Sequence, residues 1–307
     1  MLFRAYYYYR PGIPFSCMAG AVIPTECGDV DWNEIWKRQQ ARHDAARIRE
    51  DTSHNWDKKE NADRYAAGSD GEFRKRIRMT LDGLSVSSTT RVLDIGAGPG
   101  TLAIPLAYKV KDVTAIEPGA GMVAALEERV KKEKITNISC IRKVWEDVDP
   151  GRDLSGPYDL VIASLSLTMN DIREAVQKID AVSCGEVCLY WFADLPFWER
   201  MYTDLILPLH GIPYCPGPKA DCLWNVLYQS GIYANVEMLP LDKEYRFSSS
   251  SEMTTFFRKR FDAKTPEQER ILDAYLSPLM HTESEEVVIS GESTFAKIWW
   301  KKECNSR

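Results

Sequence analysis

A glycine-rich turn between a strand and a helix is the segment of this chain best suited to chemistry. Residues 91–107 read RVLDIGAGPGTLAIPLA. The β-branched, apolar start predicts a short buried strand that carries Asp94 near its end, and TLAIPLA predicts the start of a helix. Between them, Gly96, Gly98 and Gly100 carry no side chains, so a ligand can approach backbone amides at a helix N-terminus. The segment therefore predicts a ligand site at the carboxyl end of a strand.

Two classes of ligand suit such a turn, a dinucleotide and S-adenosylmethionine (SAM). The dinucleotide fingerprint is G-x-G-x-x-G, but here the third glycine comes one place early and Thr101 occupies the sixth position. The charge of Asp94 would oppose a pyrophosphate, whereas it suits the ammonium group of a methionine moiety. Glu117 lies 21 residues after Gly96, where an acid accepts hydrogen bonds from ribose hydroxyls in either class. The spacing favours SAM, and a turn without any ligand is the other alternative.

The joint pattern D-x-G-A-G-P-G-T, followed by A-I-E-P, resembles motif I and the next acid of the class I SAM-dependent methyltransferases. The resemblance is specific over residues 89–192 and looser over 230–302. It implies SAM as the cofactor, bound at the carboxyl ends of the first four strands. Among the implied residues, Trp145 would either stack on the adenine or cap the core. The cofactor-binding residues that the resemblance implies are Asp94, Gly96, Ala97, Gly98, Gly100, Glu117, Pro118, Met122, Trp145, Glu146, Ser164 and Leu165.

The acceptor side is less defined by sequence. In methyl transfer from a sulfonium the cofactor supplies the activation, so the protein positions the reactants and needs a general base only for some acceptors. His210 and Tyr65 are the candidates for a catalytic role, and a structural hydrogen bond is the alternative for the histidine. Trp56 and Tyr65 could contact the sulfonium or the acceptor, or could only pack helix against sheet. Trp198 and Tyr214 are candidates for acceptor contacts.

Strands and helices alternate from about residue 89 onward, which predicts an α/β fold. We expect a seven-stranded, mostly parallel sheet with helices on both faces. It resembles the sheet of the class I methyltransferases, with an N-terminal helical lid and a helical insertion after the fifth strand. The expected strands are 91–95, 112–117, 138–143, 158–164, 185–192, 234–247 and 292–302. The expected helices are 31–50, 53–68, 71–84, 101–109, 119–134, 171–182, 250–261 and 266–281.

The pattern divides the chain into a tail, a lid and one large domain. The tail is expected to be disordered, and either Met1 or Met18 could be the true start. The aromatic, proline-rich insertion after the fifth strand is expected to shape the acceptor pocket. The predicted parts are the tail over 1–30, the helical lid over 31–88, and the SAM-binding domain over 89–307 with insertions at about 193–231 and 250–281.

Composition narrows the class of protein further. The 307 residues are 44% hydrophobic and carry a net charge of −6, which argues against a large nucleic-acid footprint. We interpret the basic runs 74–78, 129–134 and 258–260 as solvated helix faces. Eight cysteines without a C-x-x-C pair, and four histidines without zinc-finger spacing, predict free thiols in a reducing compartment and no metal. The sequence contains no run of 18 apolar residues, so it predicts no membrane span and a cytoplasmic protein is expected.

The resemblance implies a SAM-dependent methyltransferase, and the acceptor that we expect is a small molecule. A protein side chain ranks second and RNA third, because no basic aromatic platform is evident. Two other functions remain as alternatives, a module that binds SAM or a partner without turnover, and a nucleotide-dependent oxidoreductase. The acceptor atom and the oligomeric state are not determined by the sequence.

The first prediction separates the two cofactor classes. We expect SAM and its demethylated product to bind with a micromolar or lower dissociation constant, because Asp94 and the shortened glycine spacing suit a methionine moiety and not a pyrophosphate. Isothermal titration calorimetry with SAM and with NAD measures both. Tight binding of NAD without binding of SAM would refute the interpretation.

Overall fold

The computed structural model describes residues 30–46, 56–67 and 71–302. The chain divides into two units, Met1–Asp31 and Trp32–Arg307, and every element described below belongs to the second. Residues 1–29 of the predicted tail lie outside the described part of the chain. Among the described helices, none is both long enough and apolar enough to cross a membrane.

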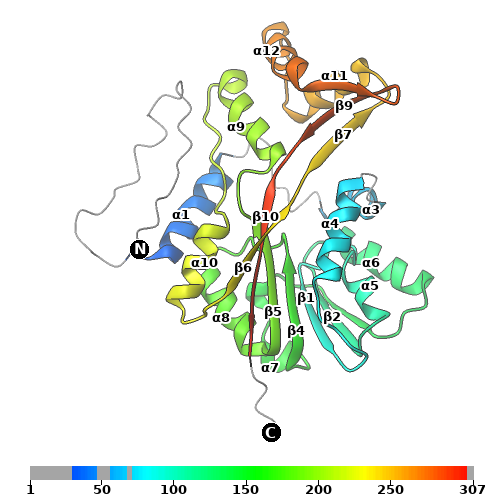
Figure 1. The fold of residues 1–307 in the computed structure, drawn as a ribbon, viewed down its shortest axis with the longest axis vertical. Coiled ribbons are helices and arrows are strands. Elements are labelled where there is room, and N and C mark those ends of the chain that lie inside the picture. The colour runs from blue at the N-terminus through cyan, green and yellow to red at the C-terminus, as the bar shows by residue number, and fades with distance from the viewer. Residues whose placement is uncertain (1–29, 47–55, 68–70, 303–307) are drawn as a thin grey trace. The chain divides into compact units, whose positions relative to one another are not determined.

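Seven strands form the main sheet, in the order β3-β2-β1-β4-β5-β10-β6 (Figure 1). Strands β1 to β5 pair in parallel, and β10 runs antiparallel to both β5 and β6. This confirms the predicted seven-stranded, mostly parallel sheet. The strands are β1 Arg91–Ile95, β2 Asp112–Ile116, β3 Ile138–Ile141, β4 Tyr158–Ser164, β5 Ser183–Phe192, β6 Asn235–Pro240 and β10 Thr294–Lys301.

Helices cover both faces of this sheet, as predicted. The short elements after β3 are the 3-10 helix η2, Trp145–Asp147, and the helix α7, Pro150–Asp153. Helix α3, Lys59–Ala67, packs on α6. The covering helices are α1 Trp32–Ala45, α8 Ile172–Val182 and α10 Ala220–Gln229 on one face, and α4 Gly71–Asp82, α5 Ala103–Ala107 and α6 Ala120–Lys132 on the other.

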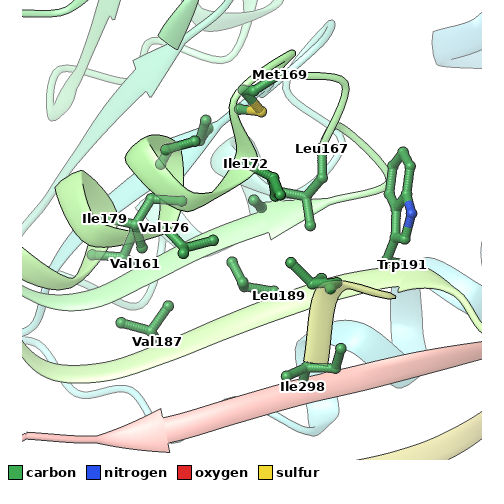
Figure 2. Packing of buried hydrophobic residues seen from close by; sticks show 14 of the residues in the cluster. Val161, Leu167, Met169, Ile172, Val176, Ile179, Val187, Leu189, Trp191 and Ile298 are labelled. Atoms are coloured by element: carbon green, nitrogen blue, oxygen red, sulfur yellow. The ribbon is translucent and has the colours of Figure 1, made fainter. Parts of the chain in front are cut away.

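The sheet buries a separate apolar cluster on each face, because side chains alternate along a strand. Leu93 of β1 packs in the cluster beneath α1, α8 and α10, whereas its neighbour Val92 packs in the cluster beneath α4 and α5. Figure 2 shows Val176 of α8 close to Val161 of β4 in the first cluster, with Leu189 of β5 nearby. These alternating contacts fix the register of the strands whose ends form the site.

The segment predicted as a lid is divided between the two faces. In α1, Trp36 is fully buried and its indole N–H donates to the carbonyl oxygen of Met169 at 2.9 Å, so α1 belongs to the layer of α8 and α10. Helices α3 and α4 lie on the opposite face, beside the glycine turn. Any lid over the cofactor is therefore limited to α3 and α4.

A second, three-stranded sheet extends beyond the main sheet (Figure 1). The helices that pack on this sheet form a separate apolar core with it. That core includes Met201, Phe257, Leu272 and Ile289. We name these elements the lobe. They are the strands β7 Lys243–Phe247, β8 Met280–Glu283 and β9 Glu286–Gly291 in the order β7-β9-β8, and the helices α9 Phe197–His210, α11 Ser250–Arg260 and α12 Pro266–Leu276.

Two predicted elements are wrong in the lobe. The strand expected over 234–247 is interrupted after Pro240, where the chain leaves β10 and its continuation pairs with β9 instead. The helix expected over 266–281 ends at Leu276, and a 3-10 turn, Ser277–Leu279, leads into β8. Pro278 explains that end, since proline has no N–H to continue the α-helical pattern. The pairing of β8 with β9 was not predicted, because their two-residue turn, Ser284 and Glu285, has positive φ at both positions without the glycine or asparagine that usually signals such a turn.

The core contacts in Figure 2 generate a stability prediction. Leu189→Ala should lower the free energy of unfolding by about 2–5 kcal/mol, since it leaves a cavity at a fully buried position. The matched control is Leu207→Ala on α9, a leucine that is 49% exposed, which should change it by less than about 0.5 kcal/mol. Urea denaturation measures both. Equal effects of the two substitutions would contradict this packing.

Candidate cofactor site

The turn after β1 is held by backbone hydrogen bonds that only glycine allows. The amides of Gly96 and Ala97 both donate to the carbonyl oxygen of Ile116, at 2.8 and 3.0 Å, which ties the turn to the end of β2. Gly96 has φ +74°, and a Cβ there would lie 2.2 Å from the Cβ of Ser166. A side chain at this position would push the turn away from the loop after β4. The glycine therefore brings three strand ends together.

Glu117 joins two loops of the site. It is 7% exposed, and its Oε2 accepts from the amide of Gly98 while its Oε1 accepts from the amide of Gly119, both at 2.8 Å. Burial raises the pKa of this carboxyl, and the two backbone hydrogen bonds act in the opposite direction. An acid held in this way can accept further hydrogen bonds from a ligand's hydroxyl groups.

Asp94 is the buried acid of the site. The residue is 2% exposed and its Oδ2 has no hydrogen-bond partner among the described residues. Burial, with the nearby charge of Glu117, raises the pKa of Asp94 to about 7, against the effect of a hydrogen bond from the amide of Ala103. An unsatisfied carboxylate oxygen facing a cavity is a site for a cationic or hydrogen-bond-donating ligand.

A pocket of about 310 Å³, measured with its open mouth, lies beside Asp94. The structure brings six sequence-predicted residues into its lining and adds four that the sequence analysis missed. The six are Tyr65, Asp94, Gly96, Ala97, Gly98 and Ser164, and the four are Arg76, Ile77, Thr101 and Leu102.

The interpretation of the basic run 74–78 as a solvated face is wrong at Arg76, which is only 7% exposed. On a helix, Arg76 follows Phe73 by three positions and Leu81 follows Ile77 by four, so the arginine lies on the apolar side of α4. That periodicity was the signal available in the sequence. It separates Arg76 from its exposed neighbours Arg74 and Arg78.

Several predicted cofactor residues lie behind or beside the pocket. Trp145 is 2% exposed, and its indole N–H donates to the Ala175 carbonyl oxygen at 3.2 Å within the core. Of the two alternatives for this ring, the structure has the one in which it packs in the core and not the one in which it stacks on the adenine. Met122 belongs to helix α6, and Gly100 packs so closely on that helix that a Cβ would lie 2.4 Å from the Leu126 side chain. The others that do not line the pocket are Pro118 and Glu146, both exposed, Leu165, whose amide donates to the Tyr190 carbonyl oxygen, and Glu117, which accepts from the amide of Gly98.

The aromatic candidates of the N-terminal segment are separated by the structure. Tyr65 lines the pocket, whereas Trp56 is 38% exposed and meets the edge of Tyr65 with 5.5 Å between ring centroids. Tyr65 in turn packs edge-on against Phe73 at 5.2 Å. Tyr65 is therefore the ring placed to contact a cation in the pocket.

The acceptor-side candidates lie around the lobe, outside the pocket. The Nε2 of His210 lies 2.8 Å from the Phe261 carbonyl oxygen, which is the structural hydrogen bond named as the alternative to a catalytic role. The Trp198 ring packs edge-on against Phe192 at the end of β5, with 5.7 Å between centroids. The Tyr214 hydroxyl donates to Glu199 at 3.1 Å.

No metal centre is formed within the described part of the chain, where no three histidine, cysteine or acidic side chains gather. The cysteines described there carry free thiols, namely Cys140, Cys184, Cys188, Cys215 and Cys222.

The comparison that decides the family covers the strands around this site. A family model described as a methyltransferase domain matches residues 92–184, which run from β1 to the start of β5. These residues form a methyltransferase domain, that of a class I SAM-dependent methyltransferase. The YcgJ protein from Bacillus subtilis shares the fold of this methyltransferase, with a TM-score of 0.51 and 14% identity over 75% of this chain and 99% of that one.

Two sequence relatives differ in how much of the methyltransferase they match. An uncharacterized protein of Haemophilus influenzae is 26% identical over 246 residues, which are 80% of this chain and 88% of that protein. A ribosomal RNA small subunit methyltransferase A of Desulforapulum autotrophicum is 38% identical over 88 residues. That shorter match spans 29% of this chain and 31% of the relative.

The residues around the pocket fit the cofactor of this family, SAM, which supplies an activated methyl group when bound. The unsatisfied Oδ2 of Asp94 can accept from an ammonium group. Gly96, Ala97 and Gly98 line the pocket with little or no side chain, and Glu117 is held at the same turn through the amide of Gly98.

The raised pKa of Asp94 generates a pH-dependent prediction. Without ligand, the unfolded carboxyl loses its proton near pH 4 and the folded one near pH 7, so the unfolded state binds fewer protons between these values. The contribution of Asp94 to the free energy of unfolding is therefore fully present below about pH 4. It falls by roughly 1.4 kcal/mol per pH unit up to about pH 7.

Asp94→Asn isolates this effect, because every other titrating group is unchanged. The difference in unfolding free energy between wild type and Asp94→Asn should therefore shift in favour of the variant as the pH rises from 5 to 8, measured by urea denaturation without SAM. A difference that is constant over this range would show that the folded pKa of Asp94 is ordinary.

Proposed function

We propose that this methyltransferase acts on a small molecule, which binds between the pocket and the lobe. A partly buried polar cluster at the carboxyl end of β5 is the observation that carries the proposal. It consists of Glu199 from α9, Tyr214 and Lys219 from the segment between α9 and α10, and His43 from α1.

The cluster is centred on Glu199, which is 6% exposed. Its carboxylate accepts from Lys219 Nζ at 2.7 Å and from the Tyr214 hydroxyl at 3.1 Å. That hydroxyl is also 3.5 Å from Nδ1 of His43, which lies 2.9 Å from the Cys215 carbonyl oxygen. Burial of an ion pair carries a desolvation cost of several kcal/mol, so such a network supports a role beyond stability.

The position of the cluster supports an acceptor site. Lys219 Nζ lies 5.8 Å from the ring centroid of Phe192, the last residue of β5, and Phe192 also contacts Trp198. β5 pairs directly with β4, whose last residue, Ser164, lines the pocket. A molecule bound beside Phe192 would therefore lie near the methionine arm of the cofactor, at the edge where ligands of such sheets collect.

The same cluster does not resemble a surface for RNA. Its one lysine is paired with Glu199, and the side chains of that pair are 15% and 8% exposed. Single-stranded RNA binding uses exposed cations and aromatic faces along a groove. The ribosomal RNA methyltransferase relative matches this chain over less than a third of its own length, so that match supports the shared family more than a shared acceptor.

A labelling experiment tests the acceptor class. A cell extract is divided into metabolites, RNA and protein, and each fraction is incubated with the enzyme and SAM carrying a radioactive methyl group. We expect label in the metabolite fraction. Label confined to RNA or to protein would refute the small-molecule proposal, and the absence of label from every fraction would favour a module without turnover.

Tyr214→Phe tests the cluster once an acceptor fraction is found. Loss of the hydroxyl should reduce kcat/KM for the acceptor about tenfold or more, because it removes a hydrogen bond to a buried carboxylate. The dissociation constant of SAM should change less than about twofold, since Tyr214 does not line the cofactor pocket. The matched control is Tyr228→Phe on α10, whose ring is 55% exposed. Normal turnover with a lowered melting temperature in Tyr214→Phe would assign the cluster to stability alone.

A further inference from the structure

Arg76 is a buried cation that lacks a carboxylate partner in the described part of the chain. Its side chain reaches from α4 into the lining of the cofactor pocket, and the residue is 7% exposed. Its interactions are a hydrogen bond from Nη1 to the Ser164 hydroxyl at 3.4 Å and a position 5.2 Å from the ring centroid of Phe73. A guanidinium has five N–H donors, so most of its hydrogen-bonding capacity is unused.

Asp94 is the opposite charge in the same pocket. It is 2% exposed and its Oδ2 is without a hydrogen-bond partner. Arg76 and Asp94 line one cavity, yet no ion pair joins them within 4.0 Å. The cation is held beside Ser164 at the end of β4, and the anion is held in β1, the neighbouring strand. The pocket therefore contains a cation and, above about pH 7, a separate anion.

This arrangement is costly without a ligand. Taking an unpaired charge out of water costs several kcal/mol, and a direct ion pair would recover part of that cost. The fold keeps the two groups apart instead. A ligand with its own anion and cation, correctly spaced, would satisfy both.

We propose that the pocket recognises an α-amino acid zwitterion, with Arg76 binding the carboxylate of the methionine arm of SAM while Asp94 accepts from its ammonium group. The inference rests on the assignment of the pocket to SAM. A guanidinium binds a carboxylate through two parallel N–H···O hydrogen bonds, which fixes the orientation of the arm as well as its affinity. Arg76 is thus a positioning residue for the cofactor.

The location of Arg76 gives this contact a second consequence. Tyr65 packs edge-on against Phe73, and the Arg76 guanidinium lies 5.2 Å from the centroid of the same Phe73 ring. A carboxylate bound by Arg76 would connect α4 and the adjoining ring of Tyr65 to the ligand. The ligand would then contact both the helical segment that carries Tyr65 and Arg76 and the glycine turn.

The test compares SAM with decarboxylated SAM, which keeps the ammonium and sulfonium groups but lacks the carboxylate. Calorimetry gives both dissociation constants for wild type and for Arg76→Met. Wild type should bind SAM more tightly than decarboxylated SAM. Arg76→Met should raise the dissociation constant of SAM by about 10- to 100-fold, the range for a lost hydrogen bond to a charged group. It should change the dissociation constant of decarboxylated SAM by less than about threefold.

The matched control is Arg78→Met, an exposed arginine on the same helix, which should leave both constants unchanged. Arg76→Lys retains the charge without the planar fork, so it should keep part of the preference for SAM if Arg76→Met does not fold. Equal losses for the two ligands in the Arg76 variants would overturn the proposal and give Arg76 a structural role. Failure of wild type to bind either ligand would instead overturn the assignment of the pocket to SAM.

Discussion

The separation of two buried, opposite charges is the constraint on which the cofactor site depends. Asp94 and Arg76 face one pocket without forming an ion pair, and each is almost fully removed from water. Flexible side chains in such a space would pair with each other. They stay apart because Asp94 is fixed by the pairing of β1 with β2 and β4, and because Arg76 is fixed by a helix packed on the sheet. The stability of the sheet therefore maintains the electrostatic strain in the pocket.

The backbone of the turn depends on the same sheet. Ile116 at the end of β2 accepts two amides of the turn after β1, and Glu117, the next residue, accepts a third from Gly98. Ser166, after β4, donates to the Ile95 carbonyl oxygen at 2.6 Å. The ends of three adjacent strands are thus joined by hydrogen bonds without any ligand. Such preorganisation reduces the conformational entropy that binding would otherwise cost.

The two sides of the site are built in different ways. The cofactor side is largely local, since Asp94 to Leu102 and Glu117 come from consecutive elements of one α/β unit. The polar cluster that we propose for the acceptor combines α1, α9 and the loop before α10, and the lobe adds strands that continue past the end of the main sheet. Its residues therefore come from elements far apart in the sequence, and their arrangement depends on long-range packing.

The sequence by itself determined the first five strands and the last one, the glycine turn and the two acids, because these depend on short-range patterns: runs of β-branched and apolar residues, glycine spacing and an acid at a strand end. It also indicated helices on both faces. Tertiary structure decided the rest. Trp145 became a core residue through its contact with α8, and the segment 234–247 was divided between two sheets. Arg76 was the least visible from sequence, since a basic run has the same composition on a solvated face as beside a cofactor. The periodicity of α4 places Arg76 on its apolar side, but only the packing of α4 against the sheet brings that side to the cofactor pocket, because this contact joins residues far apart in the chain.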